Sequence, residues 1–292
     1  MTAVIRRPPR ERTTADARLT GELRLRIGLR GRRSVVVDQF HAGALRILRA
    51  HYAGGSGHPV LTAINPGGAY LGGDEYAVQV GLETGASALL TTQSATKVYR
   101  TPQGPARAVQ RIDLAPGARF ESVPDPLIAY RGARYLQDTE VDMAADASIA
   151  LAETLTHGWS PDGQPFQFDE VSLVTRVRID GRLGVVDNLL LRPGEGGVGP
   201  LALGGRSHLA SLLVVDRRAD DGVLAALRLM LAEAFPAERG GLLVGVTRLA
   251  VPGFALRALC DSTAAAQAVL HAVINWLRAE WHGEAALELR KL

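Results

Sequence analysis

A weak internal repeat of about 30 residues constrains the fold of this chain more than any other feature of its sequence. Three segments share two apolar residues separated by one other residue, then two further residues, a Gly or Asp, and Ala. They read VGLETGA from Val80, IDLAPGA from Ile112 and VDMAADA from Val141. Gly117 follows Gly85 by 32 residues, and Asp146 follows Gly117 by 29 residues. Each segment is typical of a strand, a tight turn and a continuing strand, and one such unit cannot bury its apolar face alone. The repeat therefore predicts stacked β units, either coiled or arranged as a layered sandwich.

Strands are predicted for most of the chain, and helices only for its last third. Residues 23–30 alternate strictly, and residues 171–179 and 183–191 form two strands joined at Asp180-Gly181, a typical hairpin turn. Residues 242–251 are a late strand. Asp220-Asp221 begins a helix that runs to about residue 235, and Asp261-Ser262-Thr263 begins a longer helix that reaches Trp281. The predicted fold is mainly β within the α+β class, with β-helix-like stacked strands and helices in the C-terminal third.

The same features divide the chain into three parts. We expect a mobile N-terminus over residues 1–20, a stacked β body over residues 21–215, and an α/β C-terminal region over residues 216–292 that packs on the body. Cys260 is the only cysteine, which excludes an internal disulfide and predicts a buried, inert thiol in a reducing compartment. No signal peptide or membrane span is evident, so a cytoplasmic protein without a membrane partner is expected. A net charge of only +3 does not favour a nucleic acid partner.

The stretch from Asn65 to Arg100 carries the densest group of unusual residues. It contains the glycine pairs Gly67-Gly68 and Gly72-Gly73, followed at once by Asp74 and Glu75. A phosphate-binding loop would require Lys and Ser or Thr after its last glycine, and two carboxylates there would repel phosphate. From the residues alone, this stretch predicts two turns followed by a strand.

Two motifs in this stretch resemble those of a known family, the urease accessory proteins called UreD or UreH. NPGGAYLGGDE resembles the family's HPPGGxxGGD, and TTQSATKVYR resembles its TTPGATKFYR. Further segments between Pro116 and Arg134 are similar to its LAPGA, LPQE and ILFDGAR motifs, and the resemblance extends from Leu61 to Arg278. The residues matched to these motifs are Gly67, Gly68, Gly72, Gly73, Asp74, Thr92, Thr96, Lys97, Tyr99, Arg100, Gly132 and Ala133.

The chain departs from the family pattern at several positions. Asn65 stands near the family's histidine, Asp125 and Pro126 replace the Gln and Glu of LPQE, and Trp159 and Gln164 alter a later motif. We therefore identify the chain as a divergent member. Whether these positions alter nickel handling stays open at this point.

The resemblance implies a protein that is not an enzyme. It implies a β-helix-like body with appended helices that joins the accessory proteins UreF and UreG on apo-urease. Nickel would pass to the urease active site, by way of an internal channel through this body. No tightly bound cofactor is expected: nickel is in transit, and GTP acts only through the partner UreG.

The sequence predicts weak rather than tight nickel binding. Its seven histidines form no HxH or HxxxH cluster, and nickel favours imidazole, thiolate and carboxylate ligands, so no tight metal site is expected. A conduit instead requires single oxygen ligands that hold and release the ion. The carboxylates at the repeat strands and their ends are the candidates: Asp74, Glu75, Glu121, Asp125, Glu140, Asp142 and Glu153. Lys97 and Tyr99 share one strand face, where they would contact a partner or support a neighbouring coil.

Two other functions compete with this one. A carbohydrate-active enzyme would bind a saccharide in a β-solenoid groove, with Trp159, Phe166 and Phe168 as exposed aromatic residues. A nucleic acid binder would use the arginine-rich strand of residues 23–30, and its binding would depend steeply on salt. No GxSxG motif is present, and nothing in the sequence places a carboxylate pair about a substrate.

Overall fold

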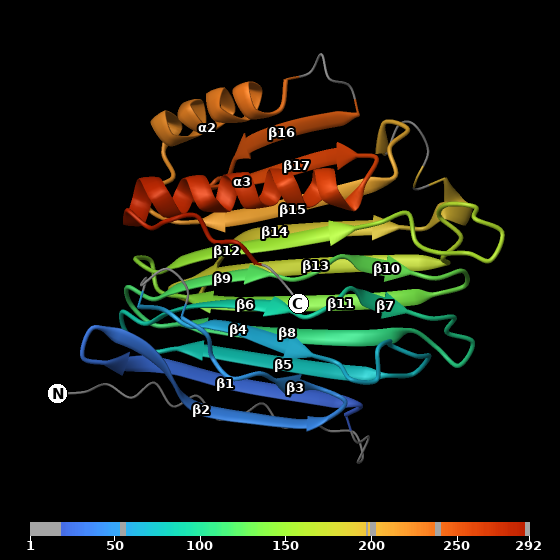
Figure 1. Cartoon of the computed structure of the whole chain (residues 1–292), viewed down its shortest axis with the longest axis horizontal. Coiled ribbons are helices and arrows are strands. Elements are labelled where there is room, and N and C mark those ends of the chain that lie inside the picture. Colours follow the sequence, from blue (N-terminus) through green and yellow to red (C-terminus); the bar gives the residue numbers. More distant parts are fainter. Residues whose placement is uncertain (1–18, 53–56, 197, 199–202, 237–240, 290–292) are drawn as a thin grey trace.

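Two β-sheets packed face to face form the body of the protein. The computed structural model describes residues 19–52, 57–196, 198, 203–236 and 241–289. Sheet A has seven strands in the order β14-β13-β11-β8-β5-β1-β2, and the main path of sheet B runs β16-β17-β15-β12-β9-β6-β4-β3. Seen as in Figure 1, the strands lie horizontally and stack from β2 at the bottom to β16 near the top.

The strands have the following bounds. Sheet A contains β1 (Gly21–Arg30), β2 (Arg33–Gly43), β5 (Glu75–Leu82), β8 (Ala106–Leu114), β11 (Arg134–Met143), β13 (Glu170–Ile179) and β14 (Arg182–Leu191). Sheet B contains β3 (Arg46–Ile47), β4 (Val60–Ile64), β6 (Ser87–Thr92), β9 (Arg119–Val123), β12 (Ser148–Leu155), β15 (His208–Val215), β16 (Leu242–Arg248) and β17 (Gly253–Cys260). Two short strands, β7 (Thr96–Val98) and β10 (Leu127–Ala129), pair beside sheet B, and a 3₁₀ turn follows at Pro193–Glu195.

The chain winds through these strands as a β-solenoid. It passes from sheet A to sheet B in the pairs β5–β6, β8–β9 and β11–β12, and strands that follow one another within a sheet pair in parallel. β7 and β10 form a short third face in the return segments and also pair in parallel. Parallel pairing requires long connections between neighbouring strands, and each coil supplies one. The predicted stack of β units is therefore confirmed as a coiled one.

The three repeat turns lie one above another, as their spacing predicted. Leu82, Leu114 and Met143 are register partners at the ends of β5, β8 and β11. Each turn closes with the same backbone hydrogen bond, donated by Ala86, Ala118 and Ala147 to the residue three places earlier. These three alanines are buried, because the small side chain points into the corner between the sheets. Neighbouring turns are also linked, since Gly85 N donates to the carbonyl oxygen of Pro116 over 2.9 Å.

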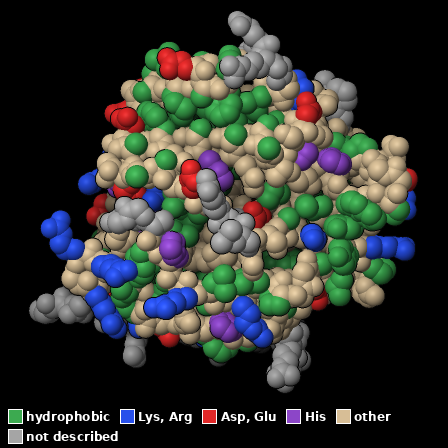
Figure 2. Space-filling model, viewed as in Figure 1, with side chains coloured by type: hydrophobic (Ala, Val, Ile, Leu, Met, Phe, Trp, Pro, Cys, Tyr) green, Lys and Arg blue, Asp and Glu red, His purple; other side chains and the backbone are tan. Residues whose placement is uncertain are grey.

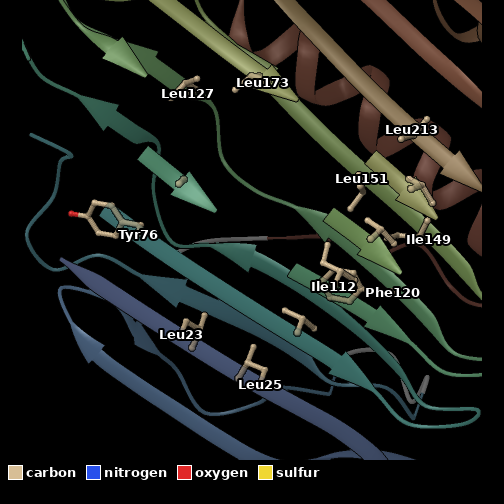
Figure 3. Packing of buried hydrophobic residues seen from close by; sticks show 14 of the residues in the cluster. Leu23, Leu25, Tyr76, Ile112, Phe120, Leu127, Ile149, Leu151, Leu173 and Leu213 are labelled. Atoms are coloured by element: carbon tan, nitrogen blue, oxygen red, sulfur yellow. The ribbon is translucent and has the colours of Figure 1, made fainter. Parts of the chain in front are cut away.

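Apolar side chains fill the space between the sheets near these turns. Strand alternation sends every second residue inward. Figure 3 shows Leu25, Ile112, Phe120, Ile149 and Leu213 meeting there from both sheets. Farther along the strands, away from the turns, the inward positions change from apolar to polar, and this change sets the location of the site described below.

The C-terminal helices cover the outer face of sheet B. Asp220 caps α2 (Asp221–Ala234) by accepting from Val223 N, and Ser262 caps α3 (Thr263–His282) by accepting from Ala265 N. Figure 1 shows α3 lying across β15 and β17. Leu227 and Val273 are fully buried in this second core, which joins the helices to the sheet. Cys260 is buried there too, as predicted, and burial raises the pKa of its thiol.

Three further sequence expectations have definite outcomes. The late strand ends at Arg248 rather than at residue 251, because Leu249 N already donates to Gly253 O in the turn to β17. The predicted mobile N-terminus falls almost entirely on residues 1–18, which lie outside the described residues. Neither helix in the described part of the chain has the length and apolar character needed to cross a membrane.

Candidate functional site

Two rows of polar side chains face each other between the sheets. In sheet A, strand register aligns Gln110, Thr139, Thr175 and Asp187 on the inward face of β8, β11, β13 and β14. In sheet B, register aligns Glu153, Ser211 and Arg257 on β12, β15 and β17. Polar groups in such a position need partners, because an unpaired polar group away from water costs free energy.

The rows border an internal cavity of about 140 Å³. Both sheets and the third face contribute to its walls, and its polar lining includes Thr92, Gln110, Asp125, Gln137, Thr139 and Glu153. Leu23, Tyr76, Leu127, Leu151 and Leu173 supply part of its apolar wall, and Figure 3 shows them arranged around this region. The cavity is therefore large enough for a few water molecules or a hydrated ion, and smaller than the pockets of about 300 Å³ or more that hold organic ligands.

A chain of hydrogen bonds crosses the cavity from sheet A to sheet B. The Tyr135 hydroxyl donates to Gln137 Oε1 over 2.9 Å, and Gln137 Nε2 donates to Glu153 Oε1 over 2.6 Å. The Tyr135 hydroxyl binds the amide oxygen of Gln137 and so fixes the orientation of the amide. The amide nitrogen therefore faces the carboxylate of Glu153 and donates to it. Glu153 is thus held at a fixed place in the cavity wall by groups of the opposite sheet.

Burial raises the pKa of Glu153 to about 7, and the nearby charge of Asp187 adds to the effect. The hydrogen bond from Gln137 and the charge of Arg257 act in the opposite direction and are weaker. At neutral pH the side chain therefore exchanges readily between its neutral and its charged form. A carboxylate with this property binds a cation when deprotonated and releases it when protonated.

Arg257 lies at one end of the two polar rows and joins them. Its guanidinium group pairs with both carboxylate oxygens of Asp187, at 2.5 and 2.6 Å, and also donates to the hydroxyl of Ser211. This bidentate pair joins β17 of sheet B to β14 of sheet A. It neutralises Asp187 and leaves Glu153 as the acidic group of the sheet B row.

Aromatic rings and a turn lie at the other end of the cavity. Tyr70 stacks on Tyr76 with ring centroids 3.7 Å apart, and both rings line the cavity. Asp74 lies in the adjoining turn, where Oδ2 accepts from Leu71 N at 2.7 Å and Oδ1 accepts from the Thr20 hydroxyl at 3.1 Å. Both oxygens of Asp74 therefore stabilise the turn, and the side chain does not line the cavity.

The structure separates the seven predicted carboxylates into three groups. Asp125 and Glu153 line the cavity. Glu75, Glu140 and Asp142 occupy positions of β5 and β11 that alternate with the inward residues, so they lie on the outer face of sheet A. Glu140 pairs there with Arg111 over 2.8 Å. The remaining two, Asp74 and Glu121, are held in hydrogen bonds and ion pairs elsewhere in the protein.

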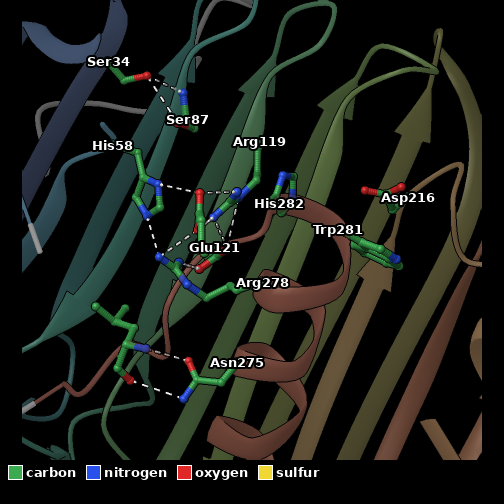
Figure 4. A network of polar contacts seen from close by, with 12 residues as sticks. Ser34, His58, Ser87, Arg119, Glu121, Asp216, Asn275, Arg278, Trp281 and His282 are labelled. Carbon is green, nitrogen blue, oxygen red and sulfur yellow. Dashed lines mark hydrogen bonds and ion pairs between the residues drawn. The ribbon is translucent and has the colours of Figure 1, made fainter. Parts of the chain in front are cut away.

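Glu121 lies in a buried ionic cluster beneath α3. It accepts from Arg278 over 2.7 Å and from Arg119 over 2.9 Å, and Arg278 also pairs with Glu284 over 3.0 Å. Figure 4 shows His58 and Arg119 meeting this group from the body while Arg278 approaches from the helix. Burial alone would raise the pKa of Glu284, but hydrogen bonds from His58 and Arg119 outweigh it and hold that pKa well below its usual range. The cluster fastens the helix and the C-terminal segment to sheet B.

The motif residues of the sequence divide between turns and the cavity wall. Gly68 and Gly73 have positive φ in their turns, and Gly72 approaches the backbone of Thr101 so closely that a Cβ atom would lie 3.0 Å from its Cα. Gly67 N donates to the side chain of Asn65, which shapes the first turn. Gly132 also has positive φ, and Ala133 is fully buried.

Thr92 and Thr96 line both the main cavity and an adjoining one of about 50 Å³. The smaller cavity also contacts Gly68 and Lys97, so both sequence motifs meet at this end of the body. The Thr92 hydroxyl accepts from Asp125 N over 2.8 Å and so holds the connection between β9 and β10. Tyr99 and Arg100 point away from these cavities, onto the exposed third face.

No three His, Cys, Asp or Glu side chains within the described ranges come close enough together to hold a metal ion. His58 belongs to the ionic cluster, and His157 and His208 are neighbours with ring centroids 5.5 Å apart. The cavity instead offers single oxygen donors at separate places along its wall.

Several cavity residues were absent from the sequence predictions: Gln110, Gln137, Thr139 and Tyr135. The alternation of β8 and β11 identifies these residues, because they occupy the same inward-facing positions of the two strands as Ile112, Val141 and Met143. Polar residues at the inward phase of a buried strand indicate an internal polar region.

A saccharide groove has less support than expected. Trp159 is exposed, but Phe168 is only 2% exposed and packs in the core, and Phe166 is half-buried against it. The two polar rows and their carboxylates lie between the sheets, away from Trp159. Fold and cavity together define the class of this protein: a β-solenoid with a polar-lined cavity between its two sheets and a helical cover on one face.

Comparison with known proteins gives the family. Residues 19–291 match the family described as UreD urease accessory protein. The chain belongs to the UreD family, as the two sequence motifs indicated. Similar proteins named urease accessory protein UreD occur in Actinomyces naeslundii, with 48% identity covering 93% of this chain and 98% of the relative. The corresponding protein of Corynebacterium glutamicum ATCC 13032 is 40% identical, covering 93% and 97%. That of Bacillus sp. TB-90 is 33% identical, covering 93% and 98%.

Proposed function

We propose that this protein is a non-catalytic urease maturation factor that binds apo-urease together with UreF and UreG and provides an internal path for nickel. Its membership of the urease accessory family supports the maturation role. The cavity between the sheets with Asp125 and Glu153 in its wall supports the path, and it is the single observation on which this part of the proposal depends. GTP acts through UreG, and nickel is cargo rather than a resident cofactor.

The ligand groups in the cavity wall are better suited to passing nickel on than to holding it tightly. Threonine hydroxyls, amide oxygens and separate carboxylates are hard, exchangeable ligands, whereas a site with several imidazoles or thiolates would hold nickel tightly. We expect the isolated protein to bind nickel only weakly, and calorimetry that showed stoichiometric submicromolar binding would contradict this expectation.

Glu153 gives the path a means of release. Its pKa of about 7 places the exchange between the cation-binding and the neutral form near physiological pH. A passing cation displaces the proton, and the returning proton displaces the cation. The amide of Gln137, whose Nε2 donates to Glu153 Oε1, stays in place beside both the charged and the neutral form of the Glu153 side chain.

The variant Glu153→Gln tests the proposal because the amide keeps the shape of the side chain and removes its charge. In a reconstituted activation assay, we expect this variant to bind its partners normally and to reduce nickel loading of urease on the order of tenfold. Nickel content of urease and urease activity are both measured. Glu140→Gln is the matched control, since Glu140 lies on the outer face of sheet A.

Normal nickel loading by a well-folded Glu153→Gln variant would contradict the path through the cavity. Loss of partner binding by the same variant would instead assign Glu153 to assembly. Asp74→Asn is expected to act through the turn that its oxygens stabilise, lowering stability rather than nickel loading specifically.

A further inference from the structure

Four largely apolar side chains, three of them exposed and one half-buried, form a ladder along the third face of the solenoid. The parallel bridge between Tyr70 and Val98 places Leu71 beside Tyr99, and the register of β7 with β10 places Tyr99 beside Tyr130. A further parallel bridge joins Tyr130 to Trp159. Each of four successive coils therefore supplies one member at the same position. We call Leu71, Tyr99, Tyr130 and Trp159 the corner ladder.

The rings of the corner ladder contact one another; Tyr99 and Trp159 remain exposed, and Tyr130 between them is half-buried. Tyr99 and Tyr130 meet edge to face with centroids 4.7 Å apart, and Tyr130 and Trp159 are 5.0 Å apart. Leu71, Tyr99 and Trp159 are 52%, 41% and 51% exposed. The residues before two of them, Val98 and Ala129, are buried, so alternation sends the ladder outward. The rings support neighbouring coils, yet half of their surface has no partner within the protein.

A contiguous exposed apolar surface of this kind is unusual on a soluble protein and marks an interaction site. Single exposed aromatic residues would carry no such meaning. Figure 2 shows hydrophobic side chains gathered over the ends of β7 and β10, at the right-hand side of the view, with Lys and Arg side chains beside them.

Arginines border the ladder and a hollow next to it. An open hollow of about 920 Å³ is lined by Arg100, Arg131, Arg134, Tyr130 and Trp159, with Asp169 as its acidic residue. Arg131 pairs with exposed Asp162 over 3.0 Å, and Arg134 lies 3.7 Å from Glu170. Arg100 is exposed and has no ion pair or side-chain hydrogen bond within the described part of the chain. The lining is therefore positively charged, and Arg100 has no partner among the residues that the structure describes.

We infer that the corner ladder and its arginines bind a segment of a partner protein that carries carboxylates next to apolar side chains. Trp, Tyr and Arg are the residues that most often dominate the binding energy of protein interfaces. The rings offer flat apolar area, Arg100 offers a bidentate donor for a carboxylate, and the positive rim attracts an acidic segment. The inference rests on the proposed function in one respect, because the partner is sought among the proteins of urease activation.

The test measures binding of the full-length protein to purified UreF and to purified apo-urease, each offered separately. Trp159→Ala removes the largest ring and Arg100→Glu reverses the unpaired charge. We expect both variants to weaken binding to one of the two proteins about tenfold or more, and added salt to weaken binding of the wild type more than that of Arg100→Glu. Arg30→Glu and Leu229→Ala are the matched controls. Arg30 lies at the opposite end of sheet A, and Leu229 is an exposed apolar residue of α2.

The possible results test the surface assignment and the proposed function separately. If the wild type binds a partner and both variants bind it equally well, the surface assignment is wrong and the proposed function stands. If the wild type binds neither protein, the proposed partners and the surface assignment are both overturned. Binding of soluble oligosaccharides that is lost in Trp159→Ala, with unchanged protein binding, would assign the hollow to a sugar instead.

Discussion

Arg278 and Glu121 form a buried ion pair with a distance of 2.7 Å, although 157 residues separate them in the sequence. Arg278 is 2% exposed and Glu121 6% exposed, so water contributes little to either charge. The pair joins α3 to β9, and with it the C-terminal region to the β body. A glutamate that the sequence placed among the nickel ligands is thus a structural anchor of the helix.

Replacement of Arg278 by Met should destabilise the protein by about 3–5 kcal/mol, because it removes one of two cations from the buried carboxylates Glu121 and Glu284 and leaves only Arg119 to pair with both. Urea unfolding at neutral pH measures the effect. Disruption of the partly exposed pair of Arg111 and Glu140 by Glu140→Gln should cost at most about 1 kcal/mol. The double variant Arg278→Met with Glu121→Leu should recover part of the loss, because it removes both buried charges. A loss below about 1 kcal/mol in Arg278→Met would show that the cluster does not anchor the helix.

Glu153 should make stability fall as the pH rises. Its pKa increases from the ordinary 4.5 to about 7 in the folded protein, which therefore holds the proton more tightly than the unfolded chain does. This contribution is fully present below about pH 4.5 and is lost as the pH rises to about 7, with a total of about 3 kcal/mol. Glu153→Gln should equal the wild type near pH 4.5 and exceed its stability near pH 8. Urea unfolding over this range checks the prediction, with Glu140→Gln as the control, and a difference that does not change with pH would contradict it.

Gly158 and Gly163 should respond very differently to Ala, although both have positive φ, of 84° and 72°. Both variants bear the backbone strain of about 1–2 kcal/mol that a side chain causes in this region. A Cβ atom at Gly158 would also overlap the carbonyl oxygen of Ala129, whereas at Gly163 it meets no atom within 4 Å. Thermal and urea unfolding should show a loss of about 3 kcal/mol or more for Gly158→Ala and about 1–2 kcal/mol for Gly163→Ala. Equal losses of stability in the two variants would mean that the backbone around Trp159 shifts to make room for the added Cβ atom at no cost.

The course of the backbone could be predicted largely from local patterns. Alternation identified β1, β13 and β14, and Asp180-Gly181 marked the turn between the last two, where both residues have positive φ. The caps Asp220 and Ser262 begin the two helices as predicted. These features depend on residues close in the sequence, so a single sequence is sufficient to find them. The early end of β16 escaped prediction because the turn to β17 uses a bond that the apolar pattern does not reveal.

The candidate site was predictable only in part. Of the predicted carboxylates, Asp125 and Glu153 line the cavity, while Glu140 and Asp142 share a strand with Gln137 and face outward. Alternation distinguishes the two faces of a strand and does not say which face encloses the cavity. Gln137 and Thr139 share the inward phase of Val141, so alternation also identifies them, whereas nickel chemistry by itself favours carboxylates over amides and hydroxyls.

By itself, the sequence determined the repeat, the β-solenoid, the late helices and the UreD family, because the spacing of Gly85, Gly117 and Asp146 and the two motifs are properties of consecutive residues. Only the tertiary structure decided which carboxylates are enclosed. The outer face of sheet B is covered by α3, so Glu121 is buried on the side opposite to the cavity and is neutralised by Arg278. That outcome depends on a contact between segments far apart in the chain, and the free energy of a buried charge is set by the partner that folding brings to it.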